Sequence, residues 1–586
     1  MEAKWNLPPD RSAEVERLAA ELHVSQLTAQ ILVNRGVTRP EAARRFLQPE
    51  LHALVDPCED PLAVEAADFL LQAARSGKRI TIFGDYDADG ICAAAVLMRT
   101  FRFLGTDAEI YIPHRVEEGY GLNHDALAEL ARTGTEVVVT VDCGISAARE
   151  VEFARESGME VVVTDHHEPR DATPDALHVV NPKLPDCSVG YEYLAGVGVA
   201  FKLVWAIGQR LSGGERVSEE FRDLLMEALA LVAIGTVADV VPLRDENRVL
   251  VSYGLKTIGA TGRPGLDALL AVSRLNPDYL TARDIAFRLA PLLNAAGRMG
   301  HPAAAVELLT TRKADTAEKL ARELDQTNRL RRKVQHETCT HAEQMAEADE
   351  TLAERSCIVL SHPEWHQGVV GLVASRLAER YNRPTFVFAR DEEYARGSAR
   401  SIPGFPLYTA VCECADLLEE YGGHQGAAGL TLRTDNLPAF VERINGVAAE
   451  LMAGGEAVPE MTLDGEIDLR RLNHNLVREI SRLEPFGEGN PQPVFAASGL
   501  KVVGNPRVVG STSRHLAFMV RQNDTTLRAF AMGKADWARP LRERKGEPLS
   551  LAFEPSINTY RGRNNLELRV RDMQWDAERV VDRLEV

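Results

Sequence analysis

The chain has 586 residues, which is too many for one hydrophobic core, so we expect three or four domains. Its hydrophobic fraction of 45% and charged fraction of 26% are those of an ordinary globular protein, and no apolar run of about 18 residues is free of charged side chains. The net charge of −19 argues against a protein that coats nucleic acid through bulk electrostatics, but it is compatible with a local basic groove or with carboxylates that hold metal ions.

The amino terminus and the cysteines indicate the compartment. The chain does not open with a basic segment followed by an apolar one, so no secretory signal is predicted. The eight cysteines are scattered without a C-x-x-C pair, which is typical of reduced thiols. We therefore expect a cytoplasmic protein that does not use a membrane.

The first 55 residues are predicted to be a helical lead-in. Two short helices are expected within residues 26–47, separated near Pro40 because proline ends or begins a helix. No chemistry is indicated there, and we expect the lead-in to pack against a later domain.

From Lys78 onward, short apolar strands alternate with helices. The apolar runs are continuous rather than alternating, which indicates a parallel sheet covered by helices on both faces. Ligands of such sheets bind beyond the carboxyl ends of the strands. The predicted strands are residues 80–83, 108–112, 136–141, 160–164 and 177–180.

Acidic and histidine side chains follow three of these strands. Carboxylates this close repel one another, and burying them unpaired costs several kcal/mol. A solvated turn or a bound divalent cation would each relieve the repulsion, and the gathering of three strand ends at one sheet edge favours the cation. The residues are Asp85, Asp87 and Asp89 after the first strand, Asp142 after the third, and Asp165, His166 and His167 after the fourth.

Asp239 is a lone acid between apolar residues at the end of a predicted helix. It is either a hydrogen-bonded buried carboxyl or a further ligand that reaches the same site from outside the sheet.

The middle of the chain is predicted to be helical. Residues 292–300 are expected to form a loop that carries an isolated Arg298. Beyond it, residues 314–355 are rich in good helix formers and would span roughly 60 Å as one helix. A coiled coil is the alternative, but the heptad pattern is poor, so we predict a long helix that connects two domains.

A second α/β unit begins near Cys357. Ser398 and Arg400 close one of its strands, and the glycine-rich residues 422–429 precede another. Glycine lets the backbone approach a ligand closely and present its N–H groups to phosphate oxygens. Together these features predict a phosphate cradle.

The pattern changes to β structure from about Pro459. Five short strands in about 110 residues fit a small barrel of the oligonucleotide-binding (OB) type. The turn Tyr560–Arg563 offers an aromatic ring and two cations, which suits single-stranded nucleic acid, although a basic hairpin tip is an equally good interpretation of the turn alone.

Taken together, these motifs resemble the DHH phosphoesterase superfamily and, within it, the RecJ-type bacterial exonucleases that are specific for single strands. Single motifs are shared with pyrophosphatases and small-nucleotide phosphatases, but their joint occurrence and order are specific. The resemblance covers about residues 50–575, and we expect no further carboxyl-terminal domain of the kind that some members carry. The motifs are Asp85–Gly90, Val141–Gly144, Asp165–His167, Thr236–Leu243, Asn294–Arg298, Gly422–Gly429 and Pro485–Pro491.

The fold implied by the resemblance is a multidomain α/β protein. A parallel-sheet DHH domain would be joined by a long helix to a smaller α/β DHHA1 domain, followed by a β-barrel OB-fold domain. The expected boundaries are residues 1–55 for the lead-in, 56–300 for the DHH domain, 301–355 for the connecting helix, 356–455 for the DHHA1 domain and 456–586 for the OB fold.

The chemistry implied by the resemblance is a two-metal phosphodiesterase that uses Mn²⁺ or Mg²⁺. Asp142 would bridge the two ions. Asp85 and His167 would either belong to the metal and catalytic groups or stand in an outer layer that orients ligands or water. The remaining implied ligands are Asp87, Asp89, His166 and Asp239.

The resemblance also implies digestion of single-stranded DNA from the 5′ end, with release of mononucleotides. Its members act in DNA repair and recombination, so a helicase and a single-strand-binding protein are expected partners of a monomer. An ordinary surface cation is the alternative for each arginine in the implied substrate site, and a turn histidine is the alternative for His424. The implied substrate-binding residues are Arg115, Arg298, Ser398, Arg400, Gly423 and His424.

Two other functions remain open at this stage. A small-molecule DHH hydrolase would act on pyrophosphate or short nucleotides, but it would need no strand-binding barrel. A replication scaffold that has lost catalysis would lack several ligands, whereas all the matching acids and His166 are present here.

Overall fold

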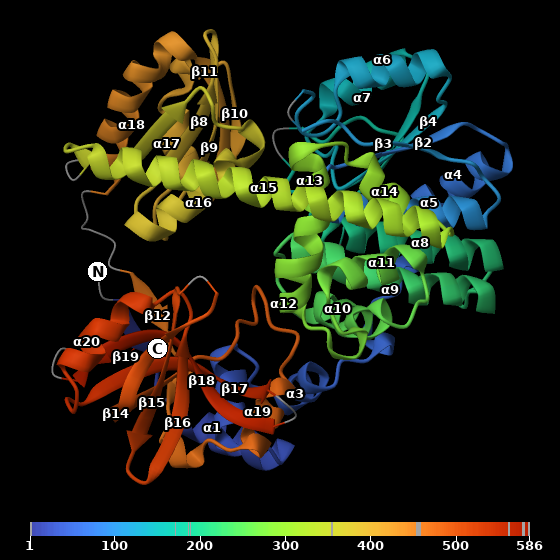
Figure 1. Cartoon of the computed structure of the whole chain (residues 1–586). Coiled ribbons are helices and arrows are strands. Elements are labelled where there is room, and N and C mark those ends of the chain that lie inside the picture. Colours follow the sequence, from blue (N-terminus) through green and yellow to red (C-terminus); the bar gives the residue numbers. More distant parts are fainter. Residues whose placement is uncertain are drawn as a thin grey trace. The chain divides into compact units, whose positions relative to one another are not determined.

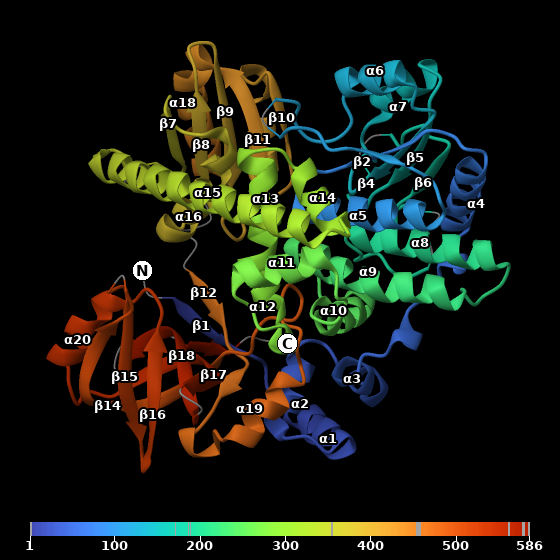
Figure 2. The same ribbon diagram turned by 45° about the vertical axis from the view of Figure 1, so that its right-hand side comes forward.

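The structure is a computed structural model of the chain, and it describes residues 3–115, 117–169, 172–185, 187, 189–352, 355–452, 459–511, 513–560, 563–576 and 581–583. The chain forms two compact units, and each is described by itself (Figures 1 and 2). Unit 1 contains Met1–Ala53, Pro242–Arg248 and Val458–Val586, and unit 2 contains Leu54–Val241 and Val249–Ala457. Within the described ranges, no helix combines the length and the apolar character needed to cross a bilayer.

The first sheet of unit 2 has five strands, all parallel, in the order β3-β2-β4-β5-β6. The central strands β2 and β4 are buried along their whole length, which is why their sequences are continuously apolar. The predicted parallel sheet is therefore confirmed. The strands are β2 (Ile80–Gly84), β3 (Glu109–Tyr111), β4 (Val137–Val141), β5 (Glu160–Thr164) and β6 (His178–Val180).

Helices cover both faces of this sheet, as Figures 1 and 2 show. On one face, α6 (His124–Thr133) and α7 (Ala148–Glu156) pack on β2, β4 and β5 through a cluster that includes Leu127, Val151 and Val161. The helices of the other face are α4 (Pro61–Arg75), α5 (Ala88–Phe103) and α8 (Gly196–Ser212), with α9 (Glu219–Ala238) packed on α5 and α8.

The prediction of a loop at residues 292–300 is wrong, because Arg298 lies on helix α13 (Ala290–Met299). Gly297 lies inside this helix and has a packing role there. A Cβ on Gly297 would lie 2.4 Å from the carbonyl oxygen of Tyr86, so glycine allows α13 to approach the turn after β2. The other helices in this stretch of the chain are α10 (Asp245–Ile258), α11 (Pro264–Ser273), α12 (Ala282–Asp284) and α14 (Ala303–Thr310).

The predicted long helix is present as α15 (Ala314–Ala348), which ends before the expected residue 355. Its 35 residues span about 50 Å at about 1.5 Å per residue. It packs on α11, α13 and α14 at one end and on α16 (Gln367–Tyr381) at the other, so it joins the two sheets of unit 2 (Figure 1).

The second sheet of unit 2 has the order β10-β11-β9-β8-β7, in which only β7 and β8 are parallel. Helices α15 and α16 cover one face, and α17 (Leu407–Cys412) and α18 (Leu437–Leu451) cover the other. The strands are β7 (Ile358–His362), β8 (Thr385–Arg390), β9 (Tyr394–Arg400), β10 (Glu420–Gly423) and β11 (Ala427–Arg433).

The glycine-rich residues 422–429 differ from the predicted turn. Most of them lie in β10 and β11, and only His424–Gly426 form the connection. The extended conformation suits glycine here because a Cβ on Gly423 would lie 2.3 Å from the carbonyl oxygen of Ala427 on the paired strand.

Unit 1 contains the predicted barrel. Five strands follow the order β14-β15-β16-β18-β17, and an additional pairing of β14 with β17 closes the ring. The bounds are β14 (Phe495–Val509), β15 (His515–Gln522), β16 (Thr525–Ala531), β17 (Leu549–Tyr560) and β18 (Arg563–Trp575).

The amino-terminal lead-in belongs to the same unit as the barrel. Leu18, Ile31 and Leu32 share one hydrophobic cluster with barrel residues such as Phe495 and Phe553. The sequence analysis did not predict strand β1 (Lys4–Leu7), which pairs in parallel with β12 (Glu460–Thr462) and β19 (Val581–Arg583). The lead-in helices are α1 (Ser12–Leu22), α2 (Gln26–Asn34) and α3 (Pro40–Leu47).

Candidate metal centre and phosphate site

The turn between β2 and α5 positions the first carboxylates. Asp87 caps α5, since its Oδ1 accepts hydrogen bonds from the backbone N–H groups of Asp89 (2.8 Å) and Gly90 (3.2 Å). Asp85 is buried, and its Oδ1 has no hydrogen-bond partner in the described part of the chain. A Cβ on Gly90 would lie 2.6 Å from the Asp85 carbonyl oxygen, so glycine permits this tight turn.

Asp89, in the first turn of α5, is completely buried, and its carboxylate faces the amino end of α8. Its Oδ2 accepts a hydrogen bond from the N–H of Gly196 (2.6 Å), and its Oδ1 accepts one from the N–H of Val197 (3.1 Å). The amino end of a helix favours such a negative charge. On α9, a Cβ on Gly235 would lie 2.5 Å from Asp89 Oδ1, so this carboxylate is enclosed by three helices.

Asp142 follows β4 in a left-handed conformation with φ of 62°, which is unusual for a residue other than glycine. Its side chain is buried, and its Oδ1 lies 3.2 Å from His166 Nε2 without a hydrogen-bond partner among the described residues. A Cβ on Gly196 would lie 2.6 Å from the Asp142 Cβ, so α8 also closes on this residue. The strained backbone directs the carboxylate into the centre of the cluster.

His166 is held with its Nε2 toward the carboxylates. That atom lies 3.5 Å from Asp239 Oδ2 and has no hydrogen-bond partner in the described chain, while the ring makes a hydrogen bond to the backbone of Leu194. Burial lowers the pKa of His166 to about 3, assisted by the neighbouring charge of His167. A neutral ring whose other nitrogen is occupied presents a lone pair at Nε2, as metal-ligating histidines do.

The structure thus brings together every sequence-predicted ligand. The ligand atoms of Asp89, His166 and Asp239 all lie within 4.8 Å of one another, and those of Asp85, Asp87 and Asp142 form a second such group. A third group joins Asp142 and His166 to His167. Because Asp142 is common to two groups and lies beside His166, it can reach both halves of the cluster.

The cluster has too much negative charge to be stable alone. Burial raises the pKa of Asp85, Asp89 and Asp142 well above the usual range, and the neighbouring carboxylates raise it further. The same causes raise the pKa of Asp239 to about 8. Oxygen-rich groups with one imidazole suit Mn²⁺ or Mg²⁺, and the unpartnered buried atoms of Asp85, Asp142 and His166 are free for such ions. The donor set therefore fits the implied metals.

Asp165 is not in a ligand group of the cluster, but it holds His167, which is. Its Oδ1 lies 2.7 Å from His167 Nδ1, and its Oδ2 accepts a hydrogen bond from the N–H of Ile145 (2.9 Å). Burial alone would raise the pKa of Asp165, but the hydrogen bond and charge of His167 lower it below the usual value. The Tyr120 hydroxyl donates to the Asp142 carbonyl oxygen (3.0 Å) and lies 3.2 Å from His167 Nδ1. His167 is thus oriented by Asp165 and Tyr120.

Four arginines gather beside the carboxylates. Burial lowers the pKa of Arg298 to about 9, and the charges of Arg115, Arg331 and Arg400 lower it further. Arg115 stacks on the Tyr86 ring (4.8 Å), and Arg400 donates to Ser398 Oγ (2.8 Å). None of the four forms an ion pair with a carboxylate within the described ranges, and such an arrangement suits an anion.

A cleft of about 920 Å³ lies between the two sheets of unit 2. His167 lines one wall, and Gly423 and His424 line the other. The imidazole of His424 is exposed, and its Nδ1 accepts a hydrogen bond from the N–H of Gly426 (3.1 Å). Partial burial of the ring and the charges of Arg400 and His167 lower the pKa of His424.

Several residues of the site were given no role from the sequence, although Asn294 belongs to one of its motifs. Asn294 accepts a hydrogen bond from the Ala88 N–H (2.7 Å) and so fixes the start of α5, and Arg331 comes from the long helix α15. Tyr120 and the glycines at 196 and 235 were missed as well. A Tyr and small residues in helix patterns carry no signal of a site until the helices are placed in space.

The predicted nucleic-acid turn of the barrel is only partly described. Arg561 and Gly562 lie outside the described residues, as do the side chains of Tyr560 and Arg563, so this prediction stays a prediction.

Three family models match successive parts of the chain. They are the DHH family, N-terminal domain, at residues 79–236, the DHHA1 domain at residues 354–450, and the RecJ OB domain at residues 463–572. Their order is that of the two sheets and the barrel described above.

Relatives resemble the chain over almost its full length. The single-stranded-DNA-specific exonuclease RecJ of Bacillus subtilis is 36% identical over 571 residues, which cover 97% of this chain and 70% of that protein. The crystal structure of RecJ from Thermus thermophilus in complex with Mn²⁺ matches with a TM-score of 0.82 and 33% identity, covering 98% of this chain and 80% of the other. Its structure in complex with Mg²⁺ matches with a TM-score of 0.74 and 31% identity, covering 98% and 78%.

Proposed function

The chain belongs to the RecJ family of single-stranded-DNA-specific exonucleases, and from this premise we propose that it hydrolyses single-stranded DNA from the 5′ end with two divalent metal ions, releasing 5′-mononucleotides. The observation that carries the proposal is the pair of ligand groups Asp89, His166, Asp239 and Asp85, Asp87, Asp142, together with an arginine cluster that has no carboxylate partner among the described residues. The first suits metal ions, and the second suits a phosphate.

The metal ligands in this proposal follow the two groups. Asp89, His166 and Asp239 would hold one ion and Asp85 and Asp87 the other, and Asp142, which also lies 3.2 Å from His166 Nε2, could serve both. Asp85 is a ligand rather than a brace, because its buried Oδ1 has no other partner in the described chain. When bound, two such ions activate a water molecule and stabilise the leaving oxygen of the phosphodiester.

The remaining residues orient the substrate and the ligands. Asp165 holds His167 Nδ1, which leaves Nε2 of His167 for a phosphate oxygen or a water molecule. Across the cleft, His424 and the Gly423 backbone are positioned to contact the scissile phosphate. The enclosed carboxylates are kept apart from bulk water by α8 and α9, which strengthens every electrostatic interaction there.

The 5′ polarity is assigned to the arginine cluster. Arg298 and Arg400 are partly buried, and Ser398 stands beside them, so a terminal phosphate would replace the mutual repulsion of guanidinium groups by bidentate hydrogen bonds. Arg115 and Arg331 complete the site. A 3′ end carries a hydroxyl group instead and would leave these cations unpaired.

The wider setting follows the family. We propose the five domains and boundaries given above, with the lead-in of residues 1–55 working as part of the barrel unit that binds the strand. The enzyme then acts as a cytoplasmic monomer in DNA repair and recombination, on strands opened by a helicase and in the presence of a single-strand-binding protein. A small-molecule hydrolase is disfavoured by the barrel, and a scaffold without catalysis is disfavoured by the full set of ligands.

The deciding experiment uses single strands that are blocked at one end. With Mn²⁺, a 3′-blocked 5′-phosphorylated strand should be digested to mononucleotides, whereas a 5′-blocked strand and duplex DNA should remain intact. Asp142→Asn protein, prepared in parallel, controls for contaminating nucleases. Digestion that stops at a 3′ block instead, or hydrolysis of pyrophosphate without attack on DNA, would contradict the proposal.

A variant tests the phosphate site separately. Arg400→Gln should raise KM for the 5′-phosphorylated strand by about ten- to a hundredfold, the effect of a lost charge-assisted hydrogen bond, with Mn²⁺ affinity unchanged. Arg433→Gln on β11, which removes an exposed cation paired with Glu393, is the matched control. An unchanged KM in Arg400→Gln would show that the arginine does not hold the 5′ end.

A further inference from the structure

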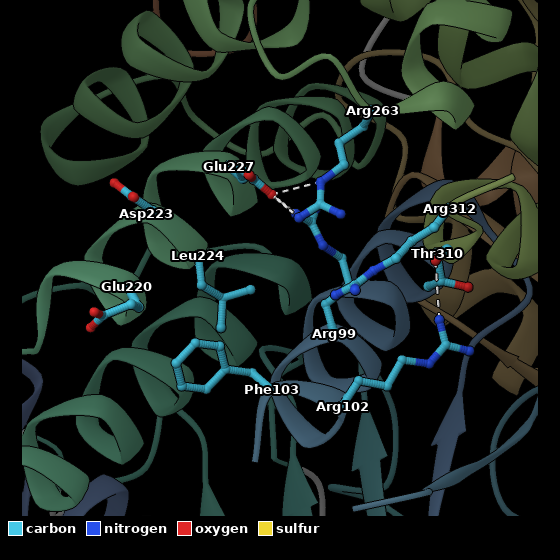
Figure 3. A pocket seen from close by; sticks show the side chains of 10 residues that line it. All are labelled: Arg99, Arg102, Phe103, Glu220, Asp223, Leu224, Glu227, Arg263, Thr310 and Arg312. Carbon is cyan, nitrogen blue, oxygen red and sulfur yellow. Dashed lines mark hydrogen bonds and ion pairs between the residues drawn. The ribbon is translucent and has the colours of Figure 1, made fainter. Parts of the chain in front are cut away.

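A second arginine cluster surrounds a small pocket elsewhere in unit 2, shown in Figure 3. Arg99 and Arg102 come from the carboxyl-terminal half of α5, roughly 15 Å along the helix from Asp89 at about 1.5 Å per residue. Arg263 precedes α11, and Arg312 lies between α14 and α15. The cavity has a volume of about 130 Å³. None of these arginines belongs to the metal centre or to the arginine cluster beside it.

A single carboxylate forms hydrogen bonds with two of the four arginines of this pocket. Glu227 of α9 accepts, through a single oxygen, hydrogen bonds from both Arg99 and Arg263 (2.7 Å to Nε of Arg263). Arg102 donates to the carbonyl oxygen of Thr310 (3.0 Å). For Arg312 the described residues provide neither a hydrogen bond nor an ion pair. Two of the four guanidinium groups therefore share one carboxylate, and the other two have no carboxylate partner among the described residues.

The other two acidic side chains that line the pocket do not neutralise the positive charge of the arginines. In Figure 3, the carboxylates of Glu220 and Asp223 lie at the opposite end, beyond Leu224 and Phe103. The local positive charge is notable in a chain whose net charge is −19.

The repulsion between the guanidinium groups acts most clearly on Arg99, whose side chain is only 8% exposed. Burial lowers the pKa of Arg99 to about 10, and the charge of Arg263 lowers it further, with a smaller effect of Arg312, against the favourable charge of Glu227. A buried guanidinium that is repelled by two others would be stabilised by an added anion.

The size and shape of the pocket limit the anion. Its volume is well below the roughly 300–1,000 Å³ of pockets that hold whole drug-sized ligands, so only a small group can enter. Planar guanidinium groups match the oxygens of a phosphate in pairs. At the rim, the ring of Phe103 is 41% exposed and could support whatever the phosphate carries outside the pocket.

We propose that the pocket formed by Arg99, Arg102, Arg263, Arg312 and Glu227 binds a phosphate group. That phosphate belongs either to a small phosphomonoester, such as a nucleotide, or to the backbone of a DNA strand. The assignment is independent of the exonuclease activity, because it rests on residues outside the metal centre.

The test is a titration of the full chain by isothermal calorimetry in EDTA, which prevents turnover, with inorganic phosphate, deoxyadenosine 5′-monophosphate and a short single-stranded oligonucleotide as separate probes. The variant is Arg312→Gln, alone and with Arg102→Gln, since both side chains are exposed and their loss should not prevent folding. The matched control is Arg216→Gln, which removes one exposed arginine between α8 and α9.

The double variant should bind one equivalent of phosphate or nucleotide fewer than the wild type, and Arg312→Gln should weaken that equivalent by about ten- to a hundredfold. Arg216→Gln should bind as the wild type does. A loss seen with phosphate or nucleotide identifies a small phosphomonoester, and a loss seen only with the oligonucleotide identifies the DNA backbone. Wild-type stoichiometry and affinity for all three probes in the double variant would overturn the proposal, whatever its exonuclease activity.

Discussion

Replacing Gly235 by alanine should damage the metal centre although it changes no polar group. Gly235 lies inside α9, where alanine is normally more favourable than glycine by about 0.8–1.0 kcal/mol. Here, however, the new Cβ would lie 2.5 Å from Asp89 Oδ1 and 2.7 Å from Val197 Cγ1. Both neighbours are buried, and the branched Val197 side chain has little freedom to rotate.

The magnitude follows from these two opposing effects. Overpacking of a buried site typically costs about 1–3 kcal/mol, which offsets the gain in helix propensity and leaves a net destabilisation of up to about 2 kcal/mol. Because Asp89 must move, Mn²⁺ affinity should fall by about 10–100-fold, as for other disturbances of ligand orientation.

The matched control is Gly446→Ala in α18, where a Cβ would meet no heavy atom within 4 Å. The same chemical change should there stabilise the protein by about 0.5–1 kcal/mol and leave Mn²⁺ binding unchanged. Urea unfolding in EDTA gives the free energies, and calorimetry gives the Mn²⁺ affinity. If Gly235→Ala binds Mn²⁺ normally and gains stability as Gly446→Ala does, the close approach of α9 to Asp89 is not what shapes the site.

Two further predictions concern the charges of the centre. Asp142→Asn should lower kcat/KM by more than about 100-fold, because it removes a metal-ligating carboxylate. Asp165→Asn, which acts only through His167, should lower kcat/KM by about 10–100-fold in the same assay. Equal losses would contradict the distinction between a metal ligand and a residue that orients one. In metal-free protein, burial and the neighbouring carboxylates raise the pKa of Asp239 to about 8, so its protonated form is favoured by folding. The contribution of protonated Asp239 to the free energy of unfolding is complete below the unfolded pKa near 4, and it is lost as the pH rises toward 8. Without metal, Asp239→Asn should therefore become progressively more stable than the wild type between these pH values. With Mn²⁺ bound, the wild type should instead be the more stable protein. A stability difference that does not change with pH would show that Asp239 is not held in a cluster of like charges.

Much of the fold could be predicted from local patterns. Continuous apolar runs such as Val137–Val141 occur because both faces of that strand are covered, and the acids that follow them must lie at one edge because parallel strands end together. The long run of helix formers without glycine or proline likewise sufficed to predict α15.

Other features depend on what approaches a residue from far along the chain. Residues 292–300 were expected to be a loop, but Gly297 lies within helix α13 and leaves room for Tyr86, which is more than two hundred residues earlier in the chain. The lead-in helices bury their apolar residues in a hydrophobic cluster that they share with barrel residues such as Phe553. Periodicity shows which face of an element is buried, but not what covers it.

The sequence by itself determined which residues could bind metal, because carboxylates at successive strand ends have few other uses. Only the tertiary structure decided which atoms converge, that Asp165 orients His167, and that Arg331 of α15 lies near Arg298. The pocket around Arg99 likewise could not be predicted from the sequence. Its four arginines come from three separate segments, and in the sequence they resemble ordinary surface cations. Electrostatic repulsion acts through space, so a shortage of carboxylate partners becomes visible only when the chain is folded.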